Sequence, residues 1–341
     1  FNLSRCVSPE IRAQRPCTMV APTPSYATTP DVERQGIFFA LLGFFSFAVH
    51  DAIIKLLGAQ FSVVQVIFCV NAVAAIPVIG IVVSRLGAGA LIPVNPGWIA
   101  ARCCAILGTV SCAFYAFSVL PLAEAYVLFF AAPLFVTLLS VPFLGETVGW
   151  RRMAAILVGF LGVLVVLRPG AADFSWGHLA GLGCALCGAS AAPIVRKIGQ
   201  PERLGVLLAY PIACNTLVMG SVMPWVAEPV GLSDLGFICL AALFFVSGQA
   251  MIVRAFRRAR AAMVAPVQYS QILWATLLGW LFFAEIPDGW TGLGACIVIG
   301  SGLFIVFREN KRDATSARPG SRAIRTEAAP SPEAARKAEL R

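Results

Sequence analysis

Long hydrophobic stretches alternate with short polar connections along most of the chain. About 20 apolar residues in an α-helix cross the hydrocarbon core of a bilayer, which is about 30 Å thick. Ten stretches approach this length, and each predicts a membrane-spanning helix: 36–57, 61–83, 97–119, 122–144, 153–168, 176–195, 204–226, 235–256, 262–284 and 290–307. Because the connections are short, consecutive helices are expected to be antiparallel neighbours. The pattern predicts an all-α integral membrane protein.

Composition supports this prediction. Of the 341 residues, 59% are hydrophobic and 13% are charged, and the mean hydropathy is +0.82. Soluble domains average about 45–50% apolar and about 25% charged residues. A soluble fold of this length has too little interior to bury so much apolar surface, so the composition excludes one.

The two ends of the chain differ from its middle. Residues 1–35 and 308–341 carry no long apolar stretch, and both are predicted to be disordered cytoplasmic tails. Met19 is a candidate start residue. The first tail does not resemble a signal peptide, because no apolar segment follows its arginines.

Basic residues are distributed unevenly between the predicted connections. If the N-terminus is cytoplasmic, ten basic residues fall on the inner side: Arg85, Arg151, Arg152, Arg196, Lys197, Arg203, Arg254, Arg257, Arg258 and Arg260. The outer side then receives Lys55 and Arg168. The positive-inside rule therefore predicts cytoplasmic termini in a bacterial-type inner membrane. The net charge of +9 is a topology signal on this interpretation, and no nucleic-acid partner is expected.

Two phrases in the chain are nearly the same. "SVPFLGETVGW" (140–150) and "GWLFFAEIPDGW" (279–290) each end an apolar stretch with a glutamate and then a tryptophan. A shift of about 139–141 residues also aligns "GFLGVLVVLRP" with "GSGLFIVFREN". The chain therefore reads as a tandem repeat of five helices, 36–168 and 176–307. Because five is odd, the second copy enters the membrane upside down, as in many secondary transporters.

These phrases and their surroundings resemble a known family. "PLAEAYVLFFAAPLFVTLLSVPFLGETVGWRRMAAILVGFLGVLVVLRPG" and its counterpart "RAAMVAPVQYSQILWATLLGWLFFAEIPDGWTGLGACIVIGSGLFIVF" are similar to the drug/metabolite transporter superfamily, EamA type. The resemblance implies a carrier for small organic solutes whose third, fourth, eighth and ninth helices line a cavity. "HDAIIKLL" resembles a bacterial branch that imports S-adenosylmethionine. Where relatives often carry arginine in the second helix, this chain has Asn71.

Four polar residues are predicted to lie near the outer side: His50, Asp51, Lys55 and Glu124. Because charges inside a bilayer are unfavourable, they are candidates for an outer gate or a proton-coupling cluster. Asp51 and Lys55 are four residues apart and share a helix face, which allows them to pair. The alternative interpretation is that Lys55 reaches the interface and Asp51 neutralises it.

Further polar and aromatic residues within the spans are candidates for binding a solute. These residues are Asn71, Tyr115, Tyr126, Gln249, Gln268, Tyr269, Gln271 and Trp274. Hydrogen bonds that hold helices together, or a place in the interfacial aromatic belt, are the alternative roles. Prolines inside the spans, Pro133 and Pro266 among them, predict kinks or hinges. Glu146 and Glu285 are expected to cap helices or to pair with nearby basic residues.

No feature of the sequence predicts a cofactor, a metal site or a catalytic residue. Most of the eleven cysteines lie in apolar stretches and are expected to act as small hydrophobic residues. Cys184 and Cys187 have redox or metal spacing, but no second pair accompanies them. Close helix packing is the predicted role of Gly159-x-x-Gly162 and Gly292-x-Gly294.

The sequence thus predicts a secondary transporter that moves a small organic metabolite by alternating access. The metabolite could be an amino acid, a nucleoside, an S-adenosylmethionine-like compound or a drug. A membrane-embedded enzyme acting on a lipid or an isoprenoid is the alternative, and it requires clustered carboxylates or histidines at one membrane face. A passive channel is less consistent with the few polar residues available for a pore. The sequence leaves a homodimer open.

Overall fold

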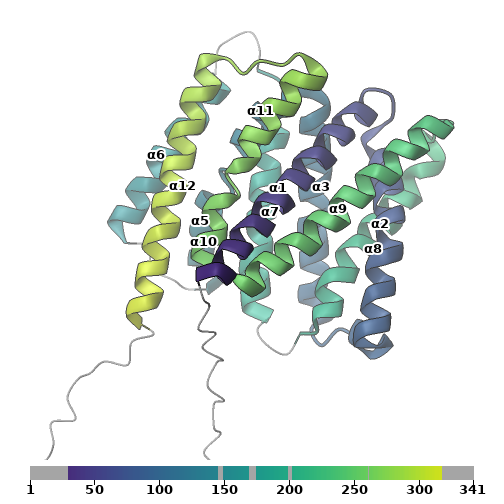
Figure 1. The fold of residues 1–341 in the computed structure, drawn as a ribbon, viewed down its shortest axis with the longest axis horizontal. Helices are drawn as coiled ribbons and strands as arrows, with labels where there is room; N and C mark the ends of the chain where they lie inside the picture. Colours follow the sequence, from purple (N-terminus) through teal and green to yellow (C-terminus); the bar gives the residue numbers. More distant parts are fainter. Residues whose placement is uncertain (1–29, 145–148, 169–173, 199–201, 260, 317–341) are drawn as a thin grey trace, which may run out of the picture.

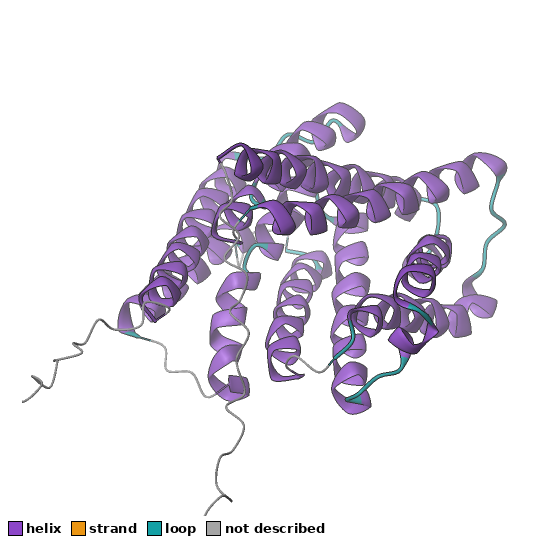
Figure 2. Cartoon of the chain, turned by 60° about the horizontal axis from the view of Figure 1, so that its bottom comes forward, coloured by secondary structure: helices purple, strands orange, loops and turns teal. Residues whose placement is uncertain are grey.

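A computed structural model describes residues 30–144, 149–168, 174–198, 202–259 and 261–316. Within these ranges every regular element is a helix, which confirms the all-α prediction (Figures 1 and 2). The helices are α1 (Pro30–Gly58), α2 (Val63–Leu86), the short 3-10 helix η1 (Ala88–Leu91), α3 (Pro96–Val119), α4 (Leu122–Phe129), α5 (Ala132–Leu144), α6 (Trp150–Leu167), α7 (Trp176–Ile198), α8 (Leu204–Val226), α9 (Leu232–Arg258), α10 (Ala261–Val267), α11 (Ser270–Phe283) and α12 (Gly289–Ser316).

The lengths of the helices largely match the predicted spans. In the described part of the chain, nine segments are long and apolar enough to cross a membrane. The exception is the predicted span 262–284, where α10 and α11 follow one another and neither is long enough alone. The helices at the two ends reach beyond their predicted limits, since α1 begins at Pro30 and α12 ends at Ser316. Residues 30–35 and 308–316 are therefore helical, although the sequence predicted disordered tails there.

Two of the helical crossings are broken near their middle. The first break separates α4 from α5 at Phe130 and Ala131, and the second separates α10 from α11 at Gln268 and Tyr269. Each break has a proline close by: Pro133 in the first turn of α5, and Pro266 near the end of α10. Since proline has no backbone N–H, it cannot continue the hydrogen-bond ladder of a preceding helix.

Each half of the chain packs mainly on the other half. Helix α1 lies along α9, and α3 lies along α7; α2 pairs with α8, and α6 pairs with α12 (Figure 1). In the order of the repeats α7 corresponds to α1, and α9 corresponds to α3. The pairing of α1 with α9 therefore reappears with the halves exchanged. Such an exchange is expected of two inverted copies related by a two-fold axis.

Small residues bring the paired helices close together. A methyl group added at Gly294 of α12 would lie 2.8 Å from the carbonyl oxygen of Gly162 on α6. One added at Gly159 would lie 2.6 Å from a side-chain carbon of Leu134 on α5. These three glycines have the predicted packing role, whereas Gly292 has open space beside it. Backbones that approach this closely gain dispersion energy where lipid provides no hydrophobic drive.

Both described ends of the chain lie on one side of the bundle, at the bottom of Figure 1. We call this the termini side and the other the opposite side. The connections from α1 to α2, from α3 to α4 and from α11 to α12 all lie on the opposite side. The polar residues described next lie inside the bundle or on that side.

Candidate functional site

Three hydrogen-bonded side chains from three helices meet inside the bundle. The Tyr126 hydroxyl on α4 donates a hydrogen bond to a carboxylate oxygen of Asp51 on α1. Gln271 on α11 donates from Nε2 to the Tyr126 oxygen over 3.4 Å, which is long for a hydrogen bond. Tyr126 and Gln271 are buried, and 16% of the Asp51 side chain is exposed. We call these three residues the polar chain, and they include members of both halves.

His50 lies beside the polar chain and connects α1 to α9. Its Nδ1 is 2.9 Å from the carbonyl oxygen of Ala241. Because a carbonyl oxygen only accepts, Nδ1 must carry the proton of this hydrogen bond. The other ring nitrogen lies 3.9 Å from Asp51 Oδ1, which is beyond hydrogen-bonding distance. His50 therefore holds two helices together, and Tyr126 is the hydrogen-bond partner of Asp51.

The second helix break carries three polar groups without a hydrogen-bond partner. The Tyr269 hydroxyl, Ser270 Oγ and Trp274 Nε1 are buried atoms that bond to nothing in the described part of the molecule. Gly302 on α12 makes room for the Tyr269 hydroxyl, because a side chain at that position would collide with it. The Tyr269 ring packs edge-on against Phe130 of the first break, with ring centroids 4.9 Å apart. Buried polar atoms normally have partners, so these three mark a place where a ligand could bind.

Lys55 makes an ion pair that its spacing did not predict. Its Nζ lies 2.5 Å from Glu285 Oε1 and donates to the Leu120 carbonyl oxygen at 2.5 Å. The other Glu285 oxygen accepts a hydrogen bond of 3.1 Å from the backbone N–H of Leu122, at the start of α4. The expected pairing of Lys55 with Asp51 is therefore wrong. Glu285 caps a helix and pairs with a basic residue, as predicted, although that residue lies in the other half of the chain.

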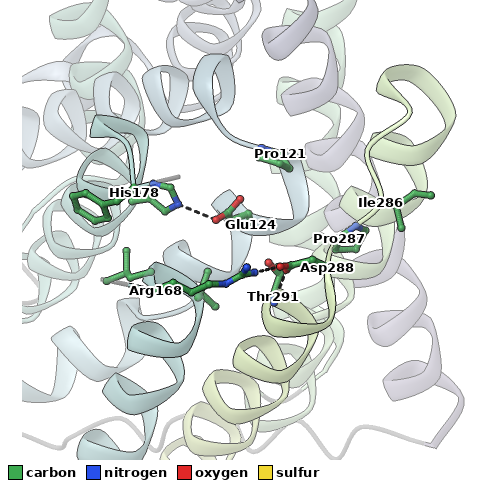
Figure 3. A pocket seen from close by; sticks show the side chains of 11 residues that line it. Pro121, Glu124, Arg168, His178, Ile286, Pro287, Asp288 and Thr291 are labelled. Carbon is green, nitrogen blue, oxygen red and sulfur yellow. Dashed lines mark hydrogen bonds and ion pairs between the residues drawn. The ribbon is translucent and has the colours of Figure 1, made fainter. Parts of the chain in front are cut away.

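A hydrogen bond and an ion pair also join the halves on the opposite side, and Figure 3 shows both. His178 Nε2 on α7 lies 2.9 Å from Glu124 Oε1 on α4. Arg168, which ends α6 in a left-handed conformation, pairs with Asp288 just before α12. His178 and Asp288 are not among the residues predicted from the sequence, and Arg168 entered only through its charge. The partner of Glu124 is thus His178, and not a residue of α1.

Four candidate residues lie apart from the polar chain. Asn71 is buried and donates to the carbonyl oxygen of Ile67, one turn earlier in its own helix, over 2.8 Å. Tyr115 is 40% exposed, and Gln249 and Gln268 are exposed as well. In the residues that the structure describes, none of the four hydrogen-bonds to the polar chain.

The described residues contain no group of three His, Cys, Asp or Glu side chains that could hold a metal ion. Cys184 and Cys187 are free thiols on α7. The predicted capping or pairing of Glu146 concerns a residue outside the described ranges.

The arrangement of the helices and the sequence point to the same relatives. The sequence profile of the EamA-like transporter family matches the chain twice, over residues 34–168 and 175–307. The chain belongs to the EamA-like transporter family. The two matches fall on the two predicted repeats.

Two relatives are similar to the chain over nearly their whole length, and a third over about two thirds of its length. The pseudopaline exporter of Pseudomonas aeruginosa is 28% identical over 280 residues, which cover 79% of this chain and 95% of the exporter. The S-adenosylmethionine uptake transporter of Rickettsia conorii is 29% identical over 282 residues, which cover 81% of this chain and 94% of the transporter. The riboflavin transporter of Rhizobium johnstonii is 30% identical over 195 residues, which cover 57% of this chain and 64% of that transporter.

A solved crystal structure has the same fold, with a TM-score of 0.55 and 16% identity over 81% of this chain and 98% of its own. At that identity the likeness shows the fold alone. The relatives are named as transporters or exporters of small metabolites. The chain is therefore a multi-pass membrane protein of a transporter family, which argues against the alternative of a membrane-embedded enzyme.

Proposed function

We propose that this protein is a secondary carrier that moves a small organic metabolite by alternating access. Two inverted halves can rock about a shared central site and so expose it to either side in turn. The observation that carries this proposal is the position of the unpartnered groups. They lie at a helix break that faces the corresponding break of the other half, through the contact of Tyr269 with Phe130.

The central solute site combines the second break with the polar chain. Tyr269, Ser270 and Trp274 offer hydrogen bonds, and Asp51 offers a negative charge. A solute that binds there completes hydrogen bonds that the protein leaves open, so its polar groups are stabilised more than they would be in an apolar cavity. Small metabolites of the kinds named for the relatives, S-adenosylmethionine and riboflavin among them, have such polar groups. The site requires no resident cofactor.

Three polar contacts on the opposite side act as a gate. Lys55 with Glu285, His178 with Glu124, and Arg168 with Asp288 each join one half to the other. Since the halves must separate on one side for the site to open there, these pairs have to break in each cycle. A gradient of the solute or of protons supplies the energy, and Asp51 is the residue that we assign to coupling.

We place both termini in the cytoplasm of a bacterial-type inner membrane, on the distribution of Lys and Arg. The gate then faces the outside. Reporter tags placed after α5 and after α11 test this orientation, because the halves are inverted. The tags are expected in different compartments, and finding both in one compartment would contradict the inverted arrangement.

Counterflow into proteoliposomes tests the carrier itself. Vesicles containing the full chain are loaded with unlabelled amino acids, nucleosides or S-adenosylmethionine, and labelled solute is added outside. A carrier gives saturable exchange that requires solute on both sides. Linear flux would support a channel, and turnover of lipid without solute movement would support an enzyme.

A further inference from the structure

Besides the central site, a pocket opens on the opposite side of the bundle (Figure 3). It encloses about 630 Å³, including the part that is open to solvent. It lies where α4, α7 and α12 begin and α6 ends, so both halves form its walls. We propose that this pocket is a second solute site, which binds the ammonium and carboxylate groups of a zwitterionic metabolite resembling an amino acid.

Glu124 supplies the position for the ammonium group. Nδ1 of His178 lies 3.1 Å from the backbone nitrogen of Ser175 and 3.3 Å from its carbonyl oxygen, which holds the ring in place at the start of α7. Nε2 donates to Glu124 Oε1 over 2.9 Å, because a carboxylate oxygen only accepts. In the described residues His178 bonds only this oxygen of Glu124, so the second oxygen, Oε2, is available to a ligand. A cation that enters the pocket would meet a carboxylate already oriented by the ring.

Arg168 supplies the position for the carboxylate group. Its guanidinium has five N–H donors, of which the NH2 group meets Asp288 and Nε, although buried, has no hydrogen-bond partner in the described residues. The side chains of Arg168 and Asp288 are 35% and 44% exposed, so water weakens their attraction. A ligand carboxylate can therefore replace Asp288 at the guanidinium.

The Asp288 carboxylate has a stabilising contact besides the one with Arg168. Its Oδ1 accepts a hydrogen bond of 2.8 Å from the backbone N–H of Thr291 in the first turn of α12. This N-terminal position stabilises a carboxylate through the exposed N–H groups of the helix. When the Arg168 guanidinium moves from Asp288 to a ligand carboxylate, the Asp288 carboxylate therefore keeps this hydrogen bond and is not left as an isolated charge.

The charges of the pocket favour a ligand with both signs. An anion alone would meet Glu124 and Asp288, and a cation alone would leave the Nε donor of Arg168 unused. The remaining walls are apolar and include Phe174 and Ile286, which suit an aliphatic side chain. Because Glu124 and Arg168 belong to the first half and their partners to the second, a bound zwitterion also loosens two pairs of the gate. In this respect the inference rests on the proposed carrier function.

Three related probes test the site on the purified full chain by isothermal titration calorimetry. L-methionine has both groups, L-methioninamide lacks the carboxylate, and 4-(methylthio)butanoate lacks the ammonium group. A charge-assisted hydrogen bond is worth enough to make L-methionine bind about tenfold more tightly than either analogue. Failure of L-methionine to bind, or equal affinity of all three probes, would overturn the proposal.

Matched variants test which residue causes the preference for the carboxylate group and which causes the preference for the ammonium group. Arg168→Gln is expected to abolish the advantage of L-methionine over the amide, and Arg168→Lys to restore part of it. Glu124→Gln is expected to abolish the advantage over 4-(methylthio)butanoate. Arg34→Gln, which removes an arginine from an exposed pair with Asp31, is the control and leaves all three affinities unchanged. Loss of affinity for all three probes alike in Arg168→Gln and Glu124→Gln would contradict the assignment.

Counterflow separates this inference from the carrier function. If the wild type exchanges solutes but Arg168→Gln and Glu124→Gln keep its probe preferences, the pocket is wrong and the carrier stands. If the wild type shows the preferences in calorimetry but exchanges no solute, the pocket stands and the carrier function is wrong.

Discussion

The two helix breaks occupy equivalent places in the two halves but carry different side chains. Phe130 and Ala131 of the first break correspond, 139 residues later, to Tyr269 of the second break and Ser270, the first residue of α11. Each pair differs by one hydroxyl group, and both hydroxyls of the second break lack a hydrogen-bond partner. The backbone geometry has been kept in both halves, whereas only the second break has acquired polar groups. The comparison separates residues that shape the fold from residues that are available to a solute.

The neighbouring positions continue this difference. Trp274, whose Nε1 is unpartnered, corresponds to Phe135 in the first half. The first half contributes Asp51 and Tyr126 instead, which are bonded to one another. One half thus provides a charge and the other provides open hydrogen-bond positions. A central site formed in this way is asymmetric, although the helices around it are nearly symmetric.

The largest effect is expected when the second break receives the side chains of the first. The variant Tyr269→Phe/Ser270→Ala removes two hydroxyls and with them two hydrogen bonds to the solute. Each bond is worth about 1–1.5 kcal/mol, so the affinity for the solute should fall by about 30- to 150-fold. Its thermal midpoint is not expected to fall, because no hydrogen bond within the protein is lost. Counterflow at several solute concentrations and a melting curve in detergent measure the two effects. A lower midpoint with unchanged affinity would show that the hydroxyls are structural.

A smaller effect is expected from the charge that the first half provides. Asp51→Asn keeps the size of the side chain but removes the negative charge that accepts from Tyr126. A hydrogen bond to a charged group is worth about 1.5–3 kcal/mol, so transport should fall by about tenfold or more. Membrane insertion, measured by the amount of protein extracted from membranes, should be unchanged. Wild-type counterflow in this variant would remove Asp51 from the mechanism.

The reverse exchange is expected to affect stability alone. Phe130→Tyr/Ala131→Ser places two hydroxyls at positions where the present side chains are apolar and buried. Each unpartnered group lowers the free energy of unfolding by about 1–3 kcal/mol. Thermal melting should therefore shift to lower temperature, with no gain in solute affinity. An unchanged midpoint would mean that both breaks offer partners to hydroxyls, and the difference between them would lose its meaning.

The sequence predicts the helices and many of the central residues because both follow simple rules. Hydropathy determines the spans, and the cost of burying polar groups in lipid singles out residues such as Asp51, Tyr126, Gln271 and Tyr269. Pro133 and Pro266 indicate where helices could break. Both broken crossings, 122–144 and 262–284, were nevertheless predicted as single helices, because the apolar composition of each is continuous.

The partners of these residues could not be predicted, since they depend on how distant helices meet. The spacing of four residues favoured Asp51 as the partner of Lys55, but the packing of α1 against α11 brings Glu285 closer. His178 stands in a glycine-rich stretch with no charged neighbour in sequence, and only its contact with Glu124 reveals it. Pairing across the halves is a tertiary property, and no local pattern in one helix encodes it.

The smallest predicted effect distinguishes two amides of the second break. Gln271 is buried and donates to Tyr126 over a long 3.4 Å, while Gln268, three residues earlier, is exposed. A bond of this length is worth about 0.5 kcal/mol, so Gln271→Leu should slow counterflow about two- to threefold. Gln268→Leu is the matched control and should exchange solute at the wild-type rate, because in the described residues its amide makes no hydrogen bond to the polar chain. If Gln268→Leu were the slower of the two, the solute would contact Gln268, and the central site would have to include that residue.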